Sequence, residues 1–113
     1  MFDLAAYKRA FEAKDVEAWI AFYAEDAEWI EYTPDAPPRA PVVMCGRAAI
    51  RSFLERVAAD PVRLSISDEV IAGDRAAWMV VCELGAGRRA IENTVVTLRD
   101  GLIVRQVEVE AWD

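Results

Sequence analysis

The sequence contains no histidine among its 113 residues, and this absence limits the chemistry that the protein could perform. A Ser-His-Asp triad and a Cys-His pair are both excluded. Zinc and non-haem iron sites lose their most common ligand, so no metal site is expected. Any proton transfer would have to use carboxylates, tyrosine, lysine, cysteine or water.

Glu31 is a candidate base because it stands in a segment, residues 28–32, whose aromatic and β-branched side chains predict a short strand. Side chains alternate along a strand, so Trp29 and Glu31 share one face. If Trp29 faces the core, Glu31 does too, and a glutamate in an apolar cavity has a raised pKa and can act near neutral pH. A solvated acid on an edge strand is the alternative.

The last predicted strand carries Gln106, Glu108 and Glu110 on one face and Val107 and Val109 on the other. The simplest expectation buries the valines and leaves the acids in solvent. We expect this for Glu108, and the orientation of Glu110 stays open.

Large aromatic side chains are more numerous than a small core needs. Most are expected to pack in the core, but a subset lining a cavity would favour a flat, apolar ring system as ligand. The proline-rich segment 33–41 would form the rim of that pocket. The candidates for ligand contact are Trp19, Trp29, Phe53, Trp78, Glu110 and Trp112.

Three stretches with apolar side chains at helical spacing are expected to position these residues. The first covers residues 4–11, and the second follows a capping Asp15 and carries its stripe over residues 16–23. The third lies between Gly46 and Asp60, where an Asp-Pro pair ends it.

From Val62 onward the pattern changes to β-strands separated by hairpin signals. Helices followed by a meander of long strands predict the α+β class, with three N-terminal helices packed on a curved, mostly antiparallel sheet. The predicted strands cover residues 63–70, 75–84, 88–99 and 102–112.

The net charge of −7 argues against binding to nucleic acid or to an anionic membrane surface, because both require a basic face. No apolar run approaches the length of a membrane-spanning helix. Cys45 and Cys82 form no C-x-x-C motif, and we expect both to be reduced in a cytoplasmic protein.

Apolar residues on both faces of the long strands predict a homodimer. Trp78 lies beside Met79, and Val80 lies beside Val81. One face would pack on the helices, so the other needs a cover, which a second copy of the chain would supply.

Three strings, taken in order, resemble the signatures of SnoaL-like and ketosteroid-isomerase-like proteins of the nuclear transport factor 2 superfamily. They are residues 13–29 (AKDVEAWIAFYAEDAEW), 46–53 (GRAAIRSF) and 99–105 (RDGLIVR). The resemblance spans essentially the whole chain. It implies a single SnoaL-like domain over residues 1–113 with the cone-shaped, cystatin-like α+β fold of that superfamily.

The resemblance also implies a pocket inside the cone and roles for residues in it. Ketosteroid-isomerase-like members carry a carboxylate base on the first strand, and Glu31 stands at that position. Their oxyanion donor is a tyrosine eight residues before the capping aspartate, which corresponds to Tyr7 before Asp15. A buried phenol can donate to a developing enolate oxygen, whereas the alternative for Tyr7 is plain core packing.

The third element of that apparatus, a protonated aspartate on a later strand, is absent. Thr94 stands in its place, with Glu92 two residues earlier on the same face. Thr94 can donate one neutral hydrogen bond, and Glu92 could substitute for the aspartate if its pKa were raised. This departure leaves a different reaction open.

These expectations favour a small enzyme that needs no cofactor and abstracts a proton α to the carbonyl of a small hydrophobic molecule, as ketosteroid isomerases or polyketide cyclases do. Two alternatives stay open. One is a non-catalytic domain that binds a hydrophobic ligand or dimerises. The other is a hydrolase or dehydratase that activates water with paired acids such as Glu31 and Glu92.

Overall fold

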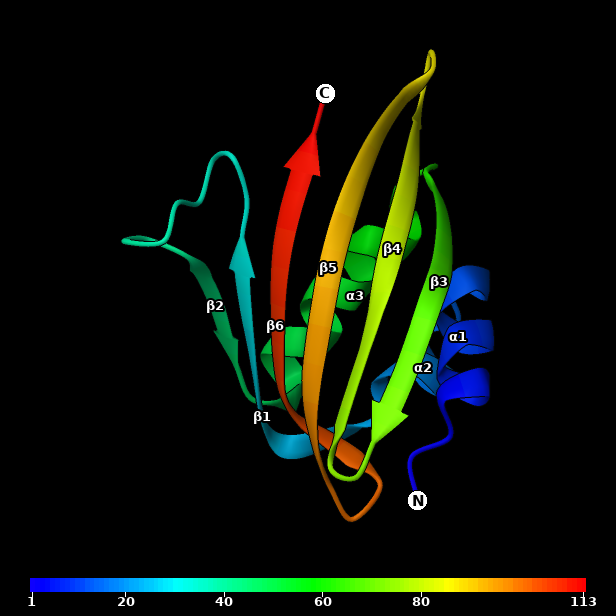
Figure 1. Cartoon of the computed structure of the whole chain (residues 1–113), viewed down its shortest axis with the longest axis vertical. Helices are drawn as coiled ribbons and strands as arrows, with labels where there is room; N and C mark the ends of the chain where they lie inside the picture. The colour runs from blue at the N-terminus through cyan, green and yellow to red at the C-terminus, as the bar shows by residue number, and fades with distance from the viewer.

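The computed structural model describes all 113 residues as a curved six-stranded sheet with three helices on one side (Figure 1). The helices are α1 (Leu4–Ala13), α2 (Val16–Ile20) and α3 (Arg47–Ala59). The strands are β1 (Tyr23–Tyr32), β2 (Val42–Cys45), β3 (Arg63–Ala72), β4 (Arg75–Gly85), β5 (Arg88–Arg99) and β6 (Leu102–Trp112).

The sheet has the strand order β2-β1-β6-β5-β4-β3, and only the β1–β6 pair is parallel. The predicted α+β class and curved, mostly antiparallel sheet are therefore confirmed. The helices are not all N-terminal to the sheet, because β1 and β2 precede α3.

Aspartate side chains cap the first two helices. The Asp3 carboxylate accepts a hydrogen bond from the Ala6 amide at 3.0 Å, and Asp15 accepts one from the Ala18 amide at 3.2 Å. Each bond satisfies an amide that has no partner inside its helix. None of the helices is long and apolar enough to cross a membrane.

The second helix is shorter than predicted. It ends at Ile20, and Tyr23 already begins β1 and pairs with Ile103 of β6. The Ile103 amide also donates to the Phe22 carbonyl at 2.8 Å. The apolar stripe over residues 16–23 thus combines a short helix with the start of a strand, because pairing with a distant strand overrides the local pattern.

The later strands lie where the sequence predicts them. β5 and β6 have the predicted bounds, while β3 and β4 extend one or two residues further. The short edge strand β2 was not predicted, since four residues after a proline-rich segment carry too little pattern. It pairs antiparallel with residues 28–31 of β1.

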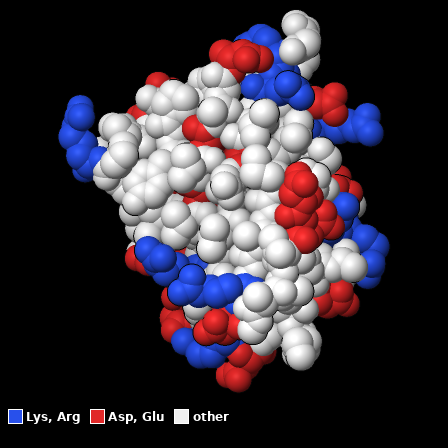
Figure 2. Space-filling view, in the orientation of Figure 1, with Lys and Arg blue, Asp and Glu red and all other residues white.

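The outer face of the sheet remains open to solvent and carries apolar side chains. Ile91, Val95 and Val109 are exposed there, whereas Trp78 and Val80 point to the helices and are buried. In Figure 2, which views this face, most of the centre is formed by uncharged side chains with a few acidic atoms between them, and the larger charged groups lie toward the margin. The expected homodimer stays a prediction on this surface.

Candidate functional site

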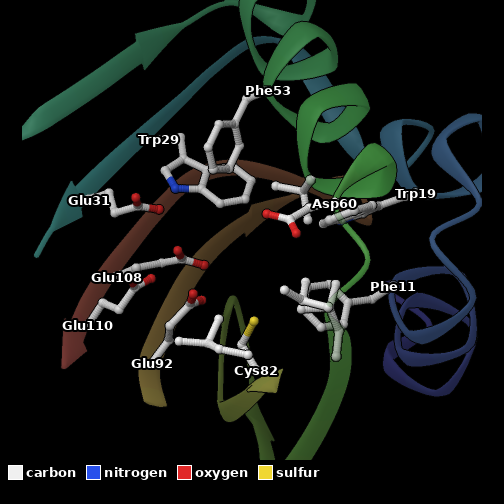
Figure 3. Close-up of a pocket in the computed structure, with 14 residues that line it drawn as sticks. Phe11, Trp19, Trp29, Glu31, Phe53, Asp60, Cys82, Glu92, Glu108 and Glu110 are labelled. Carbon is white, nitrogen blue, oxygen red and sulfur yellow. The ribbon is translucent and has the colours of Figure 1, made fainter. Parts of the chain in front are cut away.

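The helices and the concave face of the sheet enclose a cavity of about 260 Å³ (Figure 3). Its apolar wall includes Phe11, Trp19 and Phe53 from the three helices. Its acidic wall consists of Glu31, Glu92, Glu108 and Glu110 from β1, β5 and β6. No lysine or arginine lines the cavity, so its polar side carries only groups that are acidic or neutral.

Strand pairing brings the four glutamates together from distant parts of the sequence. β6 lies between β1 and β5, so Glu108 stands beside Glu31 on one side and Thr94 on the other. Glu92 stands opposite Glu110 in the β5–β6 pair. Directly paired residues point to the same face of a sheet, and here that face is the concave one.

The expectation that Glu108 is solvated is wrong. Glu108 is only 3% exposed, while Val109 is 58% exposed. The reason is a bulge: Thr97 pairs with Arg105 but Leu98 pairs with Ile103, so β6 has one extra residue at this point. An extra residue reverses the alternation of faces beyond it. The acids of β6 therefore turn inward and the valines turn outward.

Glu108 accepts hydrogen bonds from two buried neighbours at the same oxygen. Its Oε2 accepts from Gln106 Nε2 at 2.8 Å and from Thr94 Oγ1 at 3.3 Å. Because Oε2 serves as an acceptor for both donors, a proton on neutral Glu108 resides on Oε1. Glu108 also forms a hydrogen bond with Glu31.

A chain of hydrogen bonds leads from the first helix to Gln106. Trp19 Nε1 donates to the Tyr7 hydroxyl at 3.2 Å, and the Tyr7 and Tyr23 hydroxyls lie 2.9 Å apart. The Tyr23 hydroxyl donates to Gln106 Oε1 at 2.6 Å. Since Tyr23 has a single hydroxyl proton, Tyr7 must be the donor in the tyrosine pair. The donors thus point successively toward Gln106, which in turn donates to Glu108.

The structure separates the predicted site residues into two groups. Six of them line the cavity: Glu31, Glu92, Glu110, Trp19, Trp29 and Phe53. The other four, Tyr7, Thr94, Trp78 and Trp112, are not part of its walls.

Each residue of the second group lies elsewhere for an identifiable reason. Tyr7 is fully buried, with its ring 4.9 Å from that of Trp78, so it reaches Glu108 only through Tyr23 and Gln106. Thr94 lies beneath Glu108 as a donor. Trp112 ends β6 and is partly exposed. Tyr7 therefore makes no direct contact with a ligand in this cavity.

Burial and mutual repulsion raise the pKa values of three of the glutamates. Burial is the main cause for Glu108, and the neighbouring Glu31 adds to it, so its pKa lies well above the usual range. Burial, the charge of Glu108 and a hydrogen bond with Glu110 raise the pKa of Glu92 to about 12. Glu92 and Glu108 are consequently neutral near pH 7 and can donate hydrogen bonds.

Glu31 differs from these two acids. Burial raises its pKa as well, but the hydrogen bond from Glu108 and the nearby N–H of Trp29 act in the opposite direction. These donors favour the carboxylate form of Glu31. The cavity therefore combines two neutral acids, Glu92 and Glu108, with Glu31, which is the most readily ionised of the three.

Sequence reasoning missed Tyr23, Gln106 and the inward orientation of Glu108. The alternation of polar side chains at 106, 108 and 110 was visible, but the bulge that decides its direction was not. No group of three or more acidic or cysteine side chains has an arrangement suited to a metal ion.

The family model of the SnoaL-like domain matches residues 4–106. The chain belongs to the SnoaL-like domain family. Its fold is similar to the NTF2-like and ketosteroid-isomerase-like folds of solved structures. No match was found among proteins of curated function.

Solved structures share this SnoaL-like fold at low sequence identity. An NTF2-like protein of unknown function from Mesorhizobium loti is 20% identical with a TM-score of 0.82, covering 95% of this chain and 86% of that chain. A hypothetical protein with a ketosteroid isomerase-like fold from Catenulispora acidiphila, in complex with trimethylamine, is 20% identical with a TM-score of 0.69, covering 93% of this chain and 82% of that chain. At such identities these similarities establish the fold alone.

Proposed function

We propose that this protein is a cofactor-independent enzyme that abstracts a proton from the carbon next to the carbonyl group of a small hydrophobic compound. The observation that carries this proposal is the acidic wall of the cavity, where Glu31 stands among neutral Glu92 and Glu108. Carboxyl groups whose environments separate their pKa values can act as base and acid side by side.

Glu31 is the general base in this scheme. Its carboxylate takes the proton from the α-carbon, and the electron pair of the broken C–H bond moves into the carbonyl group. The O–H of Glu108 donates to the ionised Glu31 before the reaction. As Glu31 becomes protonated, that O–H is released and donates to the developing oxyanion instead. Return of the proton to another carbon completes an isomerisation, and attack of the enolate on a second carbonyl completes a cyclisation.

Tyr7 and Thr94 take supporting parts instead of contacting the substrate. Thr94 and Gln106 hold Oε2 of Glu108, which leaves Oε1 to present its proton. Tyr7 and Tyr23 hold the amide of Gln106 in the orientation that donates to Glu108. A donor fixed before the reaction costs no reorganisation when charge develops.

The size of the cavity restricts the substrate. Its volume of about 260 Å³ lies below the roughly 300–1,000 Å³ of pockets that bury drug-sized ligands. A compound with one or two rings fits this space better than a four-ring steroid. The aromatic side chains of Phe11, Trp19 and Phe53 would contact its apolar part.

Exchange of α-hydrogens for deuterium in 2-tetralone, followed by NMR, tests the proposal. Glu31→Gln keeps the shape of the side chain and removes the base, so we expect the exchange rate to fall by about 10²-fold or more. Glu28→Gln is the matched control, because Glu28 lies on the same strand and pairs with Arg105 at 3.6 Å outside the cavity. An unchanged rate in Glu31→Gln contradicts the proposal, and binding without any exchange indicates a non-catalytic binding domain.

Paired acids also favour a second candidate, a hydrolase or dehydratase. Glu31 is hydrogen-bonded to Glu108, and Glu92 to Glu110. In such a pair the ionised carboxylate activates a water molecule, while the neutral acid protonates the leaving oxygen. Incorporation of ¹⁸O from labelled water into an epoxide or ester probe distinguishes this reaction from enolisation.

A further inference from the structure

The glutamates of the cavity wall belong to two rows of paired residues across the sheet. In the first row, Glu31 of β1 pairs with Glu108 of β6, which also pairs with Thr94 of β5. In the second row, Glu110 of β6 pairs with Glu92 of β5. The rows lie two residues apart along the strands, which corresponds to about 7 Å. The proposed enolisation uses the first row and leaves the second row without a role.

The second row lacks the donors that the first row has. Gln106 and Thr94 both donate to Glu108 in the first row. In the second row, the carboxyl groups of Glu92 and Glu110 are hydrogen-bonded to each other. Two carboxyl groups can form such a bond only if one of them keeps a proton, because an ionised carboxylate has no donor. The pair therefore holds a proton in a place where no cation is available to it.

Every group that shares the cavity with Glu92 is acidic or uncharged. The titratable ones are Glu31 on β1, Cys82 on β4, Glu108 and Glu110 on β6, and Asp60 at the end of α3. Lys14 donates to the backbone carbonyl of Asp60, but its side chain does not line the cavity. Burial and the charge of Glu108 raise the pKa of Glu92 to about 12. A positive charge on a ligand would relieve the repulsion that these acids exert on one another.

Aromatic rings form the opposite side of the cavity. The rings of Phe11 and Trp19 lie 5.0 Å apart and those of Trp29 and Phe53 lie 5.2 Å apart, both pairs edge to face. In Figure 3 the carboxyl groups of the acidic wall project from the strands toward these rings. The face of an aromatic ring attracts a cation, and it also packs against the carbon atoms of an organic ammonium compound. A metal ion would find no oxygen ligands on this side.

We propose that Glu92 and Glu110 form a subsite for a protonated amine, and that the ligand is a one- or two-ring carbonyl compound whose amine lies about 7 Å from its acidic carbon. The inference rests on the proposed function, because it places the acidic carbon at Glu31 in the first row. The ammonium N–H groups donate to both carboxyl groups of the pair, and the proton that the pair shared leaves to solvent. The positive charge takes the place of that proton.

Two probes with the same ring system test the subsite by calorimetric titration. 2-Aminotetralin carries a protonated amine near pH 7, and 2-tetralol carries an uncharged hydroxyl group at the same carbon. We expect the wild-type protein to bind the amine about tenfold more tightly, since hydrogen bonds with charged groups contribute about twice as much as those between uncharged groups. Equal affinity for the two probes, or tighter binding of the alcohol, would overturn the inference.

Variants of the second row identify the subsite. Glu92→Gln keeps the shape of the neutral acid but cannot become a carboxylate, so it should reduce the preference for the amine to within about twofold and leave the affinity for 2-tetralol unchanged. Glu110→Gln should act in the same direction. Glu83→Gln is the matched control, because it removes one carboxyl group from the exposed end of β4 and should retain the preference. A preference that survives in both second-row variants would refute the assignment.

The pH dependence of binding tests the exchange of the shared proton for the amine. Glu92 holds its proton near neutral pH in the free protein, so a higher pH favours the release of that proton on binding. If one proton leaves for each amine bound, the affinity for 2-aminotetralin should rise by about tenfold per pH unit around pH 7, while that for 2-tetralol stays constant. The rise should be absent in Glu92→Gln. An affinity for the amine that is independent of pH in the wild-type protein would contradict this exchange.

Failure of this inference can be told apart from failure of the proposed function. Hydrogen exchange in 2-tetralone involves no amine, so it tests Glu31 independently of the subsite. If exchange depends on Glu31 but the preference for the amine is absent, the proposed function stands and the subsite is wrong. If the preference depends on Glu92 but exchange does not depend on Glu31, the amine subsite stands and the assigned base is wrong.

Discussion

Glu92→Gln should make the protein more stable at neutral pH and flatten the dependence of its stability on pH. Glu92 faces Glu108, Glu110 and Glu31, and no cation lines the cavity. Burial and these neighbours raise its pKa from 4.5 to about 12. Glutamine resembles the neutral acid and can still donate to Glu110, but it carries no proton that the unfolded chain releases.

The sign and size follow from proton linkage. Above pH 4.5 the unfolded chain loses the Glu92 proton while the folded protein keeps it. The stabilising contribution of Glu92 is therefore complete below that pH and is lost as the pH rises toward the folded pKa. Each retained proton lowers the free energy of unfolding by about 1.4 kcal/mol per pH unit. From pH 5 to pH 7 the difference between variant and wild type should therefore grow by about 2.7 kcal/mol.

Urea unfolding between pH 5 and pH 8 measures this difference. In thermal scans, 1 kcal/mol corresponds to about 4 °C for a domain of this size. Glu83→Gln is the control, since Glu83 is on the exposed end of β4, 3.7 Å from Arg63, and should keep the wild-type slope. If Glu92→Gln has the same pH slope as wild type, Glu92 is ionised in the folded protein and the reasoning on the acidic wall is refuted.

Three further predictions concern the buried tyrosines and the outer face of the sheet. Tyr23→Phe should lower stability by about 1–3 kcal/mol in urea unfolding, because buried Gln106 loses the donor to its Oε1. Tyr7→Phe should leave the affinity for 2-tetralone unchanged in calorimetry, since Tyr7 does not line the cavity; a large loss would show that it contacts the ligand. We expect a homodimer through the outer face, so sedimentation should show a dimer that Val109→Glu dissociates; a wild-type monomer at micromolar concentration would contradict this.

Much of the fold could be predicted from local patterns. The strands β5 and β6 could be delimited because hairpin residues mark their ends, and the cap at Asp15 because an aspartate precedes an apolar stripe. Alternation within one strand predicted that Trp29 and Glu31 share a face, and in the structure both line the cavity. Each of these features depends on residues that are close in the sequence.

The sequence by itself determined the class of chemistry and the fold class. With no histidine and an excess of acids, it restricted proton transfer to groups such as Glu31 and Glu92, and its patterns predicted an α+β fold. These conclusions need only residue types and their spacing.

Only the tertiary structure decided which of these groups meet and in which protonation state. A single extra residue near Val104 turns Glu108 inward, and alternation in the sequence cannot reveal a bulge that exists only against a partner strand. The pairing of β6 with both β1 and β5 then places Glu108 beside Glu31. Tyr7 does not line the cavity because its ring packs against Trp78 in the core. Its hydroxyl is connected to the cavity only through a chain of hydrogen bonds that begins at Tyr23. Burial and mutual repulsion set the pKa values of the glutamates, and both arise only when distant strands come together.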